Sequence, residues 1–118
     1  MTDFTADVRE RAGTAVIDLR GELDGRADAL VRDAYDQAAR GAPQAIVLNF
    51  ADVGYINSTG IALIIGMLAE ARRSAIGVGV VGLSDHYRHV FEITRLSDFM
   101  TFFDSEDEAV GDGMTAPA

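Results

Sequence analysis

Hydrophobic and polar residues alternate along the first twenty positions and predict two strands. One strand is expected over residues 4–9 and the next over residues 15–20, where apolar side chains recur at or near every second position. Residues 10–13 between them, Glu-Arg-Ala-Gly, have the length and composition of a hairpin turn. The chain is therefore expected to begin with an antiparallel pair of strands.

The spacing of apolar residues then changes and predicts helices that alternate with strands. A helix is expected over 24–40, before a stop signal at Gly41 and Pro43, and is followed by a central strand over 45–50 and a helix over 58–73. A strand over 78–81, a helix capped by Ser84, a strand over 99–103 and a short helix opened by Ser105 complete the order. This alternation predicts an α/β fold with a mixed sheet of four to five strands and helices mostly on one face.

Length and composition indicate one globular domain. The 118 residues are enough for a single core, and a hydrophobic content of 48% argues against disorder. We expect residues 1–118 to form one domain with an ordered core over about 4–110 and a flexible tail over 111–118.

Charge and the absence of cysteine narrow the classes of partner and compartment. A net charge of -9 would repel phosphate backbones and anionic lipid headgroups, so neither nucleic acid nor a membrane surface is expected as a partner. No apolar segment approaches the roughly 20 residues that span a bilayer, and no signal peptide is recognised. The charge instead favours a neutral or basic protein partner. The absence of cysteine leans toward a reducing compartment, so a cytoplasmic protein is expected.

Two neighbouring hydroxyl groups stand where the central strand gives way to the second long helix. They belong to Ser58 and Thr59, which precede Gly60. A phosphate there would meet unpaired N–H groups and the positive end of the helix dipole, which favour an anion. Serine is also a common helix N-cap, and on the residues alone this simpler interpretation is the stronger one for Ser58.

The helix expected after Ser58 is apolar almost all round. The stripe expected to face the sheet is Ile61, Ile64, Ile65 and Leu68, and Ala62, Leu63, Gly66 and Met67 lie outside it. Such a helix is either covered on both sides or presents an apolar face to a partner. We expect Leu63 and Met67 to point outward, toward a partner or, in weak self-association, toward a second copy.

Two segments resemble the STAS domain of bacterial anti-anti-sigma factors, also called anti-sigma factor antagonists. They are Gly21-Glu22-Leu23-Asp24, which follows the second strand, and NFADVGYINSTGI over residues 49–61. The order of expected elements agrees with this family from about residue 4 to residue 110. The segment over residues 90–93, with Leu96 and Phe99, is similar to the family's third-helix region.

This resemblance implies a partner-switching protein without enzymatic activity. Unphosphorylated family members bind an anti-sigma factor that is also a serine kinase of the histidine-kinase-like ATPase fold, and so release the sigma factor. The kinase phosphorylates a serine that matches Ser58, and a PP2C-type phosphatase removes the phosphate. Thr59 is the alternative acceptor, and Asp24 matches a loop that lies near the serine in the family.

One residue departs from the family pattern. The family commonly has Asp before the phosphorylated serine, whereas this chain has the isosteric but uncharged Asn57. The departure bears on phosphorylation more than on the fold. The expected partner-binding surface comprises Gly21, Glu22, Leu23, Asp24, Asn57, Ser58, Thr59, Gly60, Leu63 and Met67.

Other interpretations stay open beside this one. The chain could be an unphosphorylated STAS scaffold or adaptor in a sensory or transport-accessory complex. A small serine hydrolase is the weakest alternative, because Ser58 lacks a Gly-x-Ser-x-Gly elbow. His86 and His89 have a spacing that can share a metal, but two nitrogen ligands without a third ligand are poor evidence, so we expect no metal and no cofactor.

Overall fold

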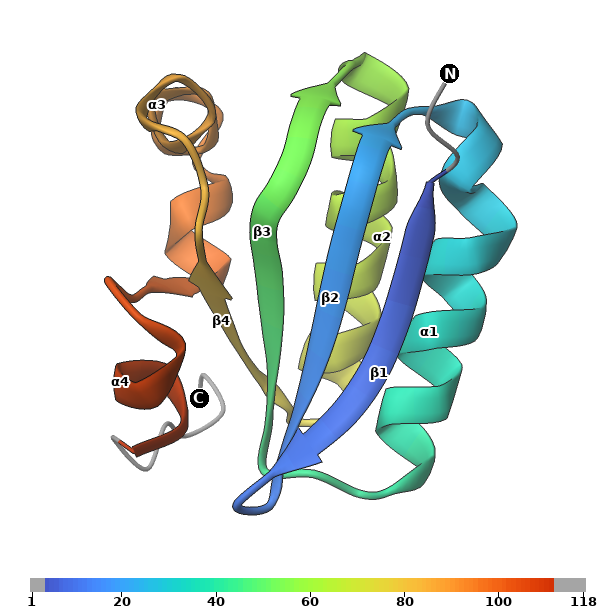
Figure 1. The fold of residues 1–118 in the computed structure, drawn as a ribbon, viewed down its shortest axis with the longest axis vertical. Helices are drawn as coiled ribbons and strands as arrows, with labels where there is room; N and C mark the ends of the chain where they lie inside the picture. Colours follow the sequence, from blue (N-terminus) through green and yellow to red (C-terminus); the bar gives the residue numbers. More distant parts are fainter. Residues whose placement is uncertain (1–3, 112–118) are drawn as a thin grey trace.

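A five-stranded mixed sheet runs through the protein in a computed structural model that describes residues 4–111 (Figure 1). The strands lie side by side in chain order, β1-β2-β3-β4-β5. Their bounds are β1 Thr5–Arg11, β2 Thr14–Leu23, β3 Ala45–Ile56, β4 Gly77–Val81 and β5 Thr101–Phe102. The β1–β2 hairpin is antiparallel, as the sequence predicted, and the other three pairs are parallel, which makes the sheet mixed.

Helices connect the parallel strands and gather mainly on one face of the sheet (Figure 1). The helical elements are η1 Gly25–Ala27, α1 Asp28–Arg40, α2 Ser58–Arg73, α3 Asp85–Ile93, η2 Leu96–Phe99 and α4 Glu106–Gly111. Crossovers between parallel strands are right-handed, so successive connections in chain order place their helices on the same side. The short α4 lies on the opposite face. The predicted α/β fold, with helices mostly on one face, is confirmed.

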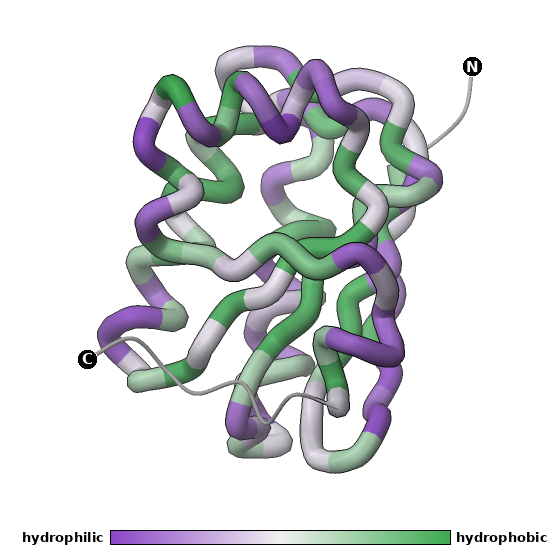
Figure 2. The backbone as a smooth tube through the Cα atoms, turned by 90° about the vertical axis from the view of Figure 1, so that its left-hand side faces the viewer, coloured by the Kyte–Doolittle hydropathy of each residue, from purple (hydrophilic) through white to green (hydrophobic). Residues whose placement is uncertain are grey.

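Alternating side chains of the central strands divide the apolar interior between the two faces. Ile17, Leu48 and Val80 pack into the large core under the helices, whereas Val16 and Val47 join a small cluster under α4. Figure 2 shows hydrophobic stretches through the middle of the molecule and hydrophilic residues recurring along the outer helices. Because neighbouring side chains of a strand point to opposite faces, the central strands supply apolar surface to both faces of the sheet.

An ion-pair network holds α4 against the hairpin. The Arg9 guanidinium donates to Asp18, with Nε 2.7 Å from Oδ2, and also to the Glu106 carboxylate. These hydrogen bonds hold the pKa of Asp18 and of Glu106 below their usual values, against the opposing effect of burial. Arg11 adds further contacts to Glu106 and Asp107. The network thus joins β1 to α4, although the two elements lie near opposite ends of the sequence.

Several predicted boundaries differ from the structure. The central strand continues past residue 50 to Ile56, because it keeps pairing with β2 beyond the end of the predicted strand. The first helix starts as η1 before α1, and β5 is shorter than the predicted 99–103 because η2 occupies residues 96–99. Within the expected tail, Gly111 ends α4 and residues 112–118 lie outside the described residues.

Candidate functional site

Asn57, and not Ser58, caps α2. The Asn57 side-chain Oδ1 accepts a hydrogen bond from the Gly60 N–H at 2.8 Å, with Asn57 in an extended conformation. The interpretation of Ser58 as the N-cap is therefore wrong. Ser58 is the first residue of the helix and is exposed, and no hydrogen bond of its hydroxyl is found within residues 4–111. Its hydroxyl faces solvent at the positive end of the helix dipole.

The loop that ends β2 lies directly against the first turn of α2, residues 57–60, which we call the Ser58 turn. The Asn57 N–H donates to the Leu23 carbonyl oxygen at 3.2 Å. Gly60 approaches the same carbonyl so closely that a Cβ built on it would lie 2.0 Å from the Leu23 oxygen. Gly21 has a φ of 102°, and the pairing of β2 with β3 shifts register between Gly21 and Glu22. The two motifs that carried the family resemblance are thus neighbours in space.

Asp24 shapes the entrance to the first helix on the same side. Its Oδ1 accepts a hydrogen bond from the Arg26 main-chain N–H at 2.9 Å, and the Arg26 guanidinium Nη2 lies 2.8 Å from Oδ2. These hydrogen bonds, with the side chain of Arg26 as the larger contributor, lower the pKa of Asp24. Gly25 faces Thr59, since a Cβ built on Gly25 would lie 3.3 Å from Thr59 Cγ2. Asp24 therefore shapes a loop that packs beside the first turn of α2, with its own side chain 15% exposed.

Tyr87 supports the turn from α3, a role that the sequence analysis missed. Its hydroxyl oxygen accepts a hydrogen bond from the Ile56 N–H at 3.0 Å, at the last residue of β3. The Ser84 side chain caps α3 and so fixes the helix that carries Tyr87. No sequence pattern links these segments, because the contact depends on how α3 packs at the end of the sheet.

The predicted sides of α2 are wrong for two residues, one expected to point outward and one expected to face the sheet. Met67 is only 5% exposed and belongs to the core, whereas Ile65, expected to face the sheet, is 48% exposed. The buried stripe of α2 is Gly60, Ile64, Met67, Leu68 and Ala71, because the helix packs against α1 as well as against the sheet. Leu63 is half-buried and borders the surface, so it is the one of the two predicted contact residues that a partner can reach.

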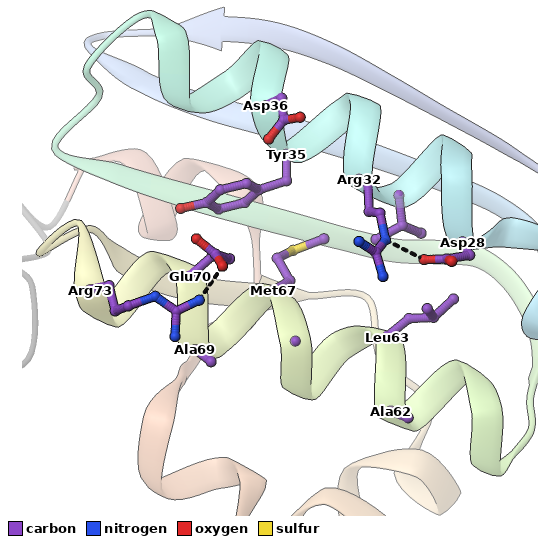
Figure 3. A pocket seen from close by; sticks show the side chains of 12 residues that line it. Asp28, Arg32, Tyr35, Asp36, Ala62, Leu63, Met67, Ala69, Glu70 and Arg73 are labelled. Carbon is purple, nitrogen blue, oxygen red and sulfur yellow. Dashed lines mark hydrogen bonds and ion pairs between the residues drawn. The ribbon is translucent and has the colours of Figure 1, made fainter.

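Leu63 and Met67 line a groove of about 360 Å³ between α1 and α2 (Figure 3). The Tyr35 ring extends across it from α1 toward the end of α2 that carries Glu70 and Arg73. The charged groups along its rim are largely paired within their own helices, Arg32 with Asp28 and Arg73 with Glu70. The groove therefore explains why α2 carries more apolar residues than its sheet-facing stripe requires.

The two histidines are not gathered with other metal-binding side chains. The His86 ring packs edge-on against Tyr87 at a centroid distance of 4.9 Å. No group of three or more His, Cys, Asp or Glu residues that could hold a metal ion is found among the residues described. No helix within residues 4–111 is long and apolar enough to cross a membrane.

Comparison with known proteins assigns the family. The STAS domain family matches residues 5–109. The anti-sigma-B factor antagonist of Listeria monocytogenes is 28% identical over 111 residues, which cover 92% of this chain and 96% of the relative. The fold resembles that of the anti-sigma factor antagonist SpoIIAA in its unphosphorylated form, with a TM-score of 0.70 and 27% identity over 93% of this chain and 96% of that one.

A second structure shows the same likeness in another state. The Bacillus cell fate determinant SpoIIAA in its phosphorylated form has a TM-score of 0.71 and 28% identity, covering 95% of this chain and all of that chain (100%). This chain belongs to the STAS domain family. With antagonists of anti-sigma factors as its relatives, it is a regulatory domain and not an enzyme.

Proposed function

We propose that this chain is an anti-sigma factor antagonist that binds a serine-kinase anti-sigma factor of the histidine-kinase-like ATPase fold and is released when Ser58 is phosphorylated. One observation carries the proposal: Ser58 is exposed at the first turn of α2 while Asn57 supplies the N-cap. Modification of the Ser58 hydroxyl therefore leaves the cap of the helix intact. The similarity to SpoIIAA, which is known in phosphorylated and unphosphorylated forms, supports the same conclusion.

The switch follows from the charge that a phosphate would bring. A phosphoserine carries about -1.5 to -2 charges, which the N-terminus of α2 and solvent accommodate in the free protein. In a complex that covers Ser58, the phosphate would lose its water next to the carboxylates of Glu22 and Asp24. Burying such a charge against a partner face that offers it no cation costs several kcal/mol, which is enough to separate the two proteins.

The proposed docking surface joins the Ser58 turn to the loop over residues 21–24 and to Leu63 one turn into α2. The hydrogen bond between Asn57 and Leu23 keeps the turn and the loop in one arrangement. A preorganised surface of this kind binds without the cost of ordering a loop. The net charge of -9 favours a partner that is neutral or basic at its contact face.

Phosphorylation by the partner tests this proposal. The protein is incubated with ATP and a histidine-kinase-like anti-sigma factor from the same organism, and the modified residue is mapped by mass spectrometry. One phosphate on Ser58, absent from Ser58→Ala and retained in Thr59→Val, is expected. Stoichiometric phosphate on Thr59 alone would refute the site. Stable binding with no phosphate on either residue would instead favour the scaffold interpretation. A PP2C-type phosphatase should remove the phosphate.

A further inference from the structure

Arg26 is the only basic residue in the two segments that form the Ser58 site, residues 21–27 and 57–60. Its guanidinium Nη2 lies 2.8 Å from Asp24 Oδ2 and 3.6 Å from Glu22 Oε2. The Arg26–Glu22 pair is accessible to solvent, with side chains 66% and 57% exposed, whereas the Asp24 side chain is only 15% exposed. The exposed pair with Glu22 contributes little to stability, and the contact with Asp24 is the one that a competing anion must replace.

Arg26 belongs to the segment that packs against the first turn of α2. Gly25 faces Thr59, with 3.3 Å between a Cβ built on Gly25 and Thr59 Cγ2. Arg26 and Ser58 are the sequence neighbours of these two contacting residues. A long, unbranched arginine side chain can reorient without movement of the main chain, and from this neighbouring segment its guanidinium can turn toward a group attached to Ser58.

We propose that Arg26 is the counter-ion of phosphorylated Ser58, its guanidinium turning from the carboxylates of Glu22 and Asp24 to the phosphate oxygens. The inference rests on the proposed phosphorylation of Ser58. A guanidinium can pair with phosphate through two parallel hydrogen bonds, as it can with a carboxylate. The phosphate has the larger charge, so the exchange is favoured.

The loop keeps its shape when the guanidinium moves. Asp24 caps η1 through the Arg26 main-chain N–H at 2.9 Å, and this bond does not depend on the Arg26 side chain. The exchange instead leaves the Glu22 carboxylate without the guanidinium that faced it. Phosphorylation would thus change the charge of the loop over residues 21–24 as well as that of Ser58, and a partner that covers both would meet two altered surfaces.

The experiment uses protein in which phosphoserine is inserted at position 58 during translation, so that no kinase is needed. The phosphate pKa is measured by ³¹P NMR titration, and circular dichroism verifies the fold of each variant. In the parent protein the phosphate pKa should fall below its usual value of about 6. Arg26→Gln should raise it by roughly half to one unit. The matched control is Arg32→Gln, which removes a cation from α1. It should change the phosphate pKa by less than about 0.2 units.

The Arg26 side-chain Nε–Hε signal gives a second readout, and it should shift between unmodified and phosphorylated protein. An unchanged phosphate pKa in Arg26→Gln, an equal change in Arg32→Gln, or an Arg26 signal unaffected by phosphorylation would each overturn the proposal. Failure of every kinase to modify Ser58 would count against the proposed function alone, because the phosphate is installed here without one.

Discussion

The carbonyl oxygen of Leu23 accepts a hydrogen bond from the main-chain N–H of Asn57 at 3.2 Å. This bond joins the end of β2 to the residue that caps α2. It requires the first turn of the helix to approach the strand closely, and Gly60 permits that approach because it has no side chain. The contact therefore holds the Ser58 turn and the loop over residues 21–24 as one surface.

Gly60→Ala should destabilise the protein strongly. The new Cβ would lie 2.0 Å from the Leu23 oxygen, so either the helix or the strand must move. Overpacking of this kind costs about 3 kcal/mol or more when main-chain atoms are involved. Urea unfolding followed by circular dichroism measures the effect.

The matched control is Gly66→Ala in the middle of the same helix, where a Cβ meets nothing within 4 Å. Because alanine is the better helix former, this variant should be about 0.5–1 kcal/mol more stable than the parent. Equal stability of the two variants would show that the close approach at Gly60 is not required.

Asn57→Ala should cost about 1 kcal/mol of stability, since it removes the side-chain acceptor for the Gly60 N–H. Asn57→Asp keeps an acceptor and adds a negative charge at the helix N-terminus, which should add about 0.3–1 kcal/mol at low ionic strength. Thermal or urea unfolding of the three proteins compares them. If Asn57→Ala unfolds like the parent, Asn57 does not stabilise α2 as its cap.

Met67→Lys should reduce the stability by about 2 kcal/mol or more. Met67 is buried between α1 and α2, and a lysine there loses the core contacts of the methionine and must lead its ammonium out through the groove that Asp36 and Glu70 also line. Ile65→Lys on the exposed side of the same helix should change the stability by less than about 0.5 kcal/mol. Circular dichroism and urea unfolding distinguish the two, and a folded, stable Met67→Lys protein would contradict the burial of this residue.

These residues also show which parts of the structure the sequence predicts. The bounds of α2 are predicted correctly because local signals mark both of its ends. The orientation of its apolar stripe is wrong for Ile65 and Met67, since packing against α1 rotates the buried side and no local pattern records that contact. Three successive residues, Asn57, Ser58 and Thr59, are of types that commonly occupy the N-cap position. Only the hydrogen bond from the Gly60 N–H identifies Asn57 as the cap.

The long-range contacts were beyond prediction for the same reason. Arg9 meets Glu106 only because α4 folds back over the sheet, and Tyr87 meets Ile56 only because α3 packs at the end of β3. The neighbouring positions of the loop over residues 21–24 and the Ser58 turn were expected from the family resemblance alone. The structure adds the bond between Leu23 and Asn57 that joins them.

Removing Arg9 should destabilise the protein in a pH-dependent way. Arg9 holds the pKa of Asp18 and Glu106 below their usual values, so its contribution is fully present above about pH 5.5, where both carboxyls are ionised even in the unfolded chain. The contribution is lost as the pH falls through the lowered folded-state pKa values. Arg9→Gln should cost about 1–2 kcal/mol at pH 7, after allowance for the partial exposure of the network.

Urea unfolding of the parent and of Arg9→Gln between pH 7 and pH 2.5 provides the measurement. The difference between their free energies of unfolding should shrink steadily below about pH 4. The exposed pair of Arg32 with Asp28 serves as a comparison, and Arg32→Gln should have a much smaller effect at every pH. A difference for Arg9→Gln that stays constant down to pH 2.5 would mean that these carboxylates do not depend on Arg9.

A phosphate on Ser58 should end an interaction that the unmodified protein makes. The most direct test compares the affinity of the kinase anti-sigma factor for unmodified protein, for protein with phosphoserine inserted at position 58, and for Ser58→Ala, by isothermal titration. The unmodified protein and Ser58→Ala should bind equally well. The phosphorylated protein should bind at least about 100-fold more weakly, a difference of roughly 2.7 kcal/mol. Equal affinities of the phosphorylated and unmodified proteins would contradict the switch.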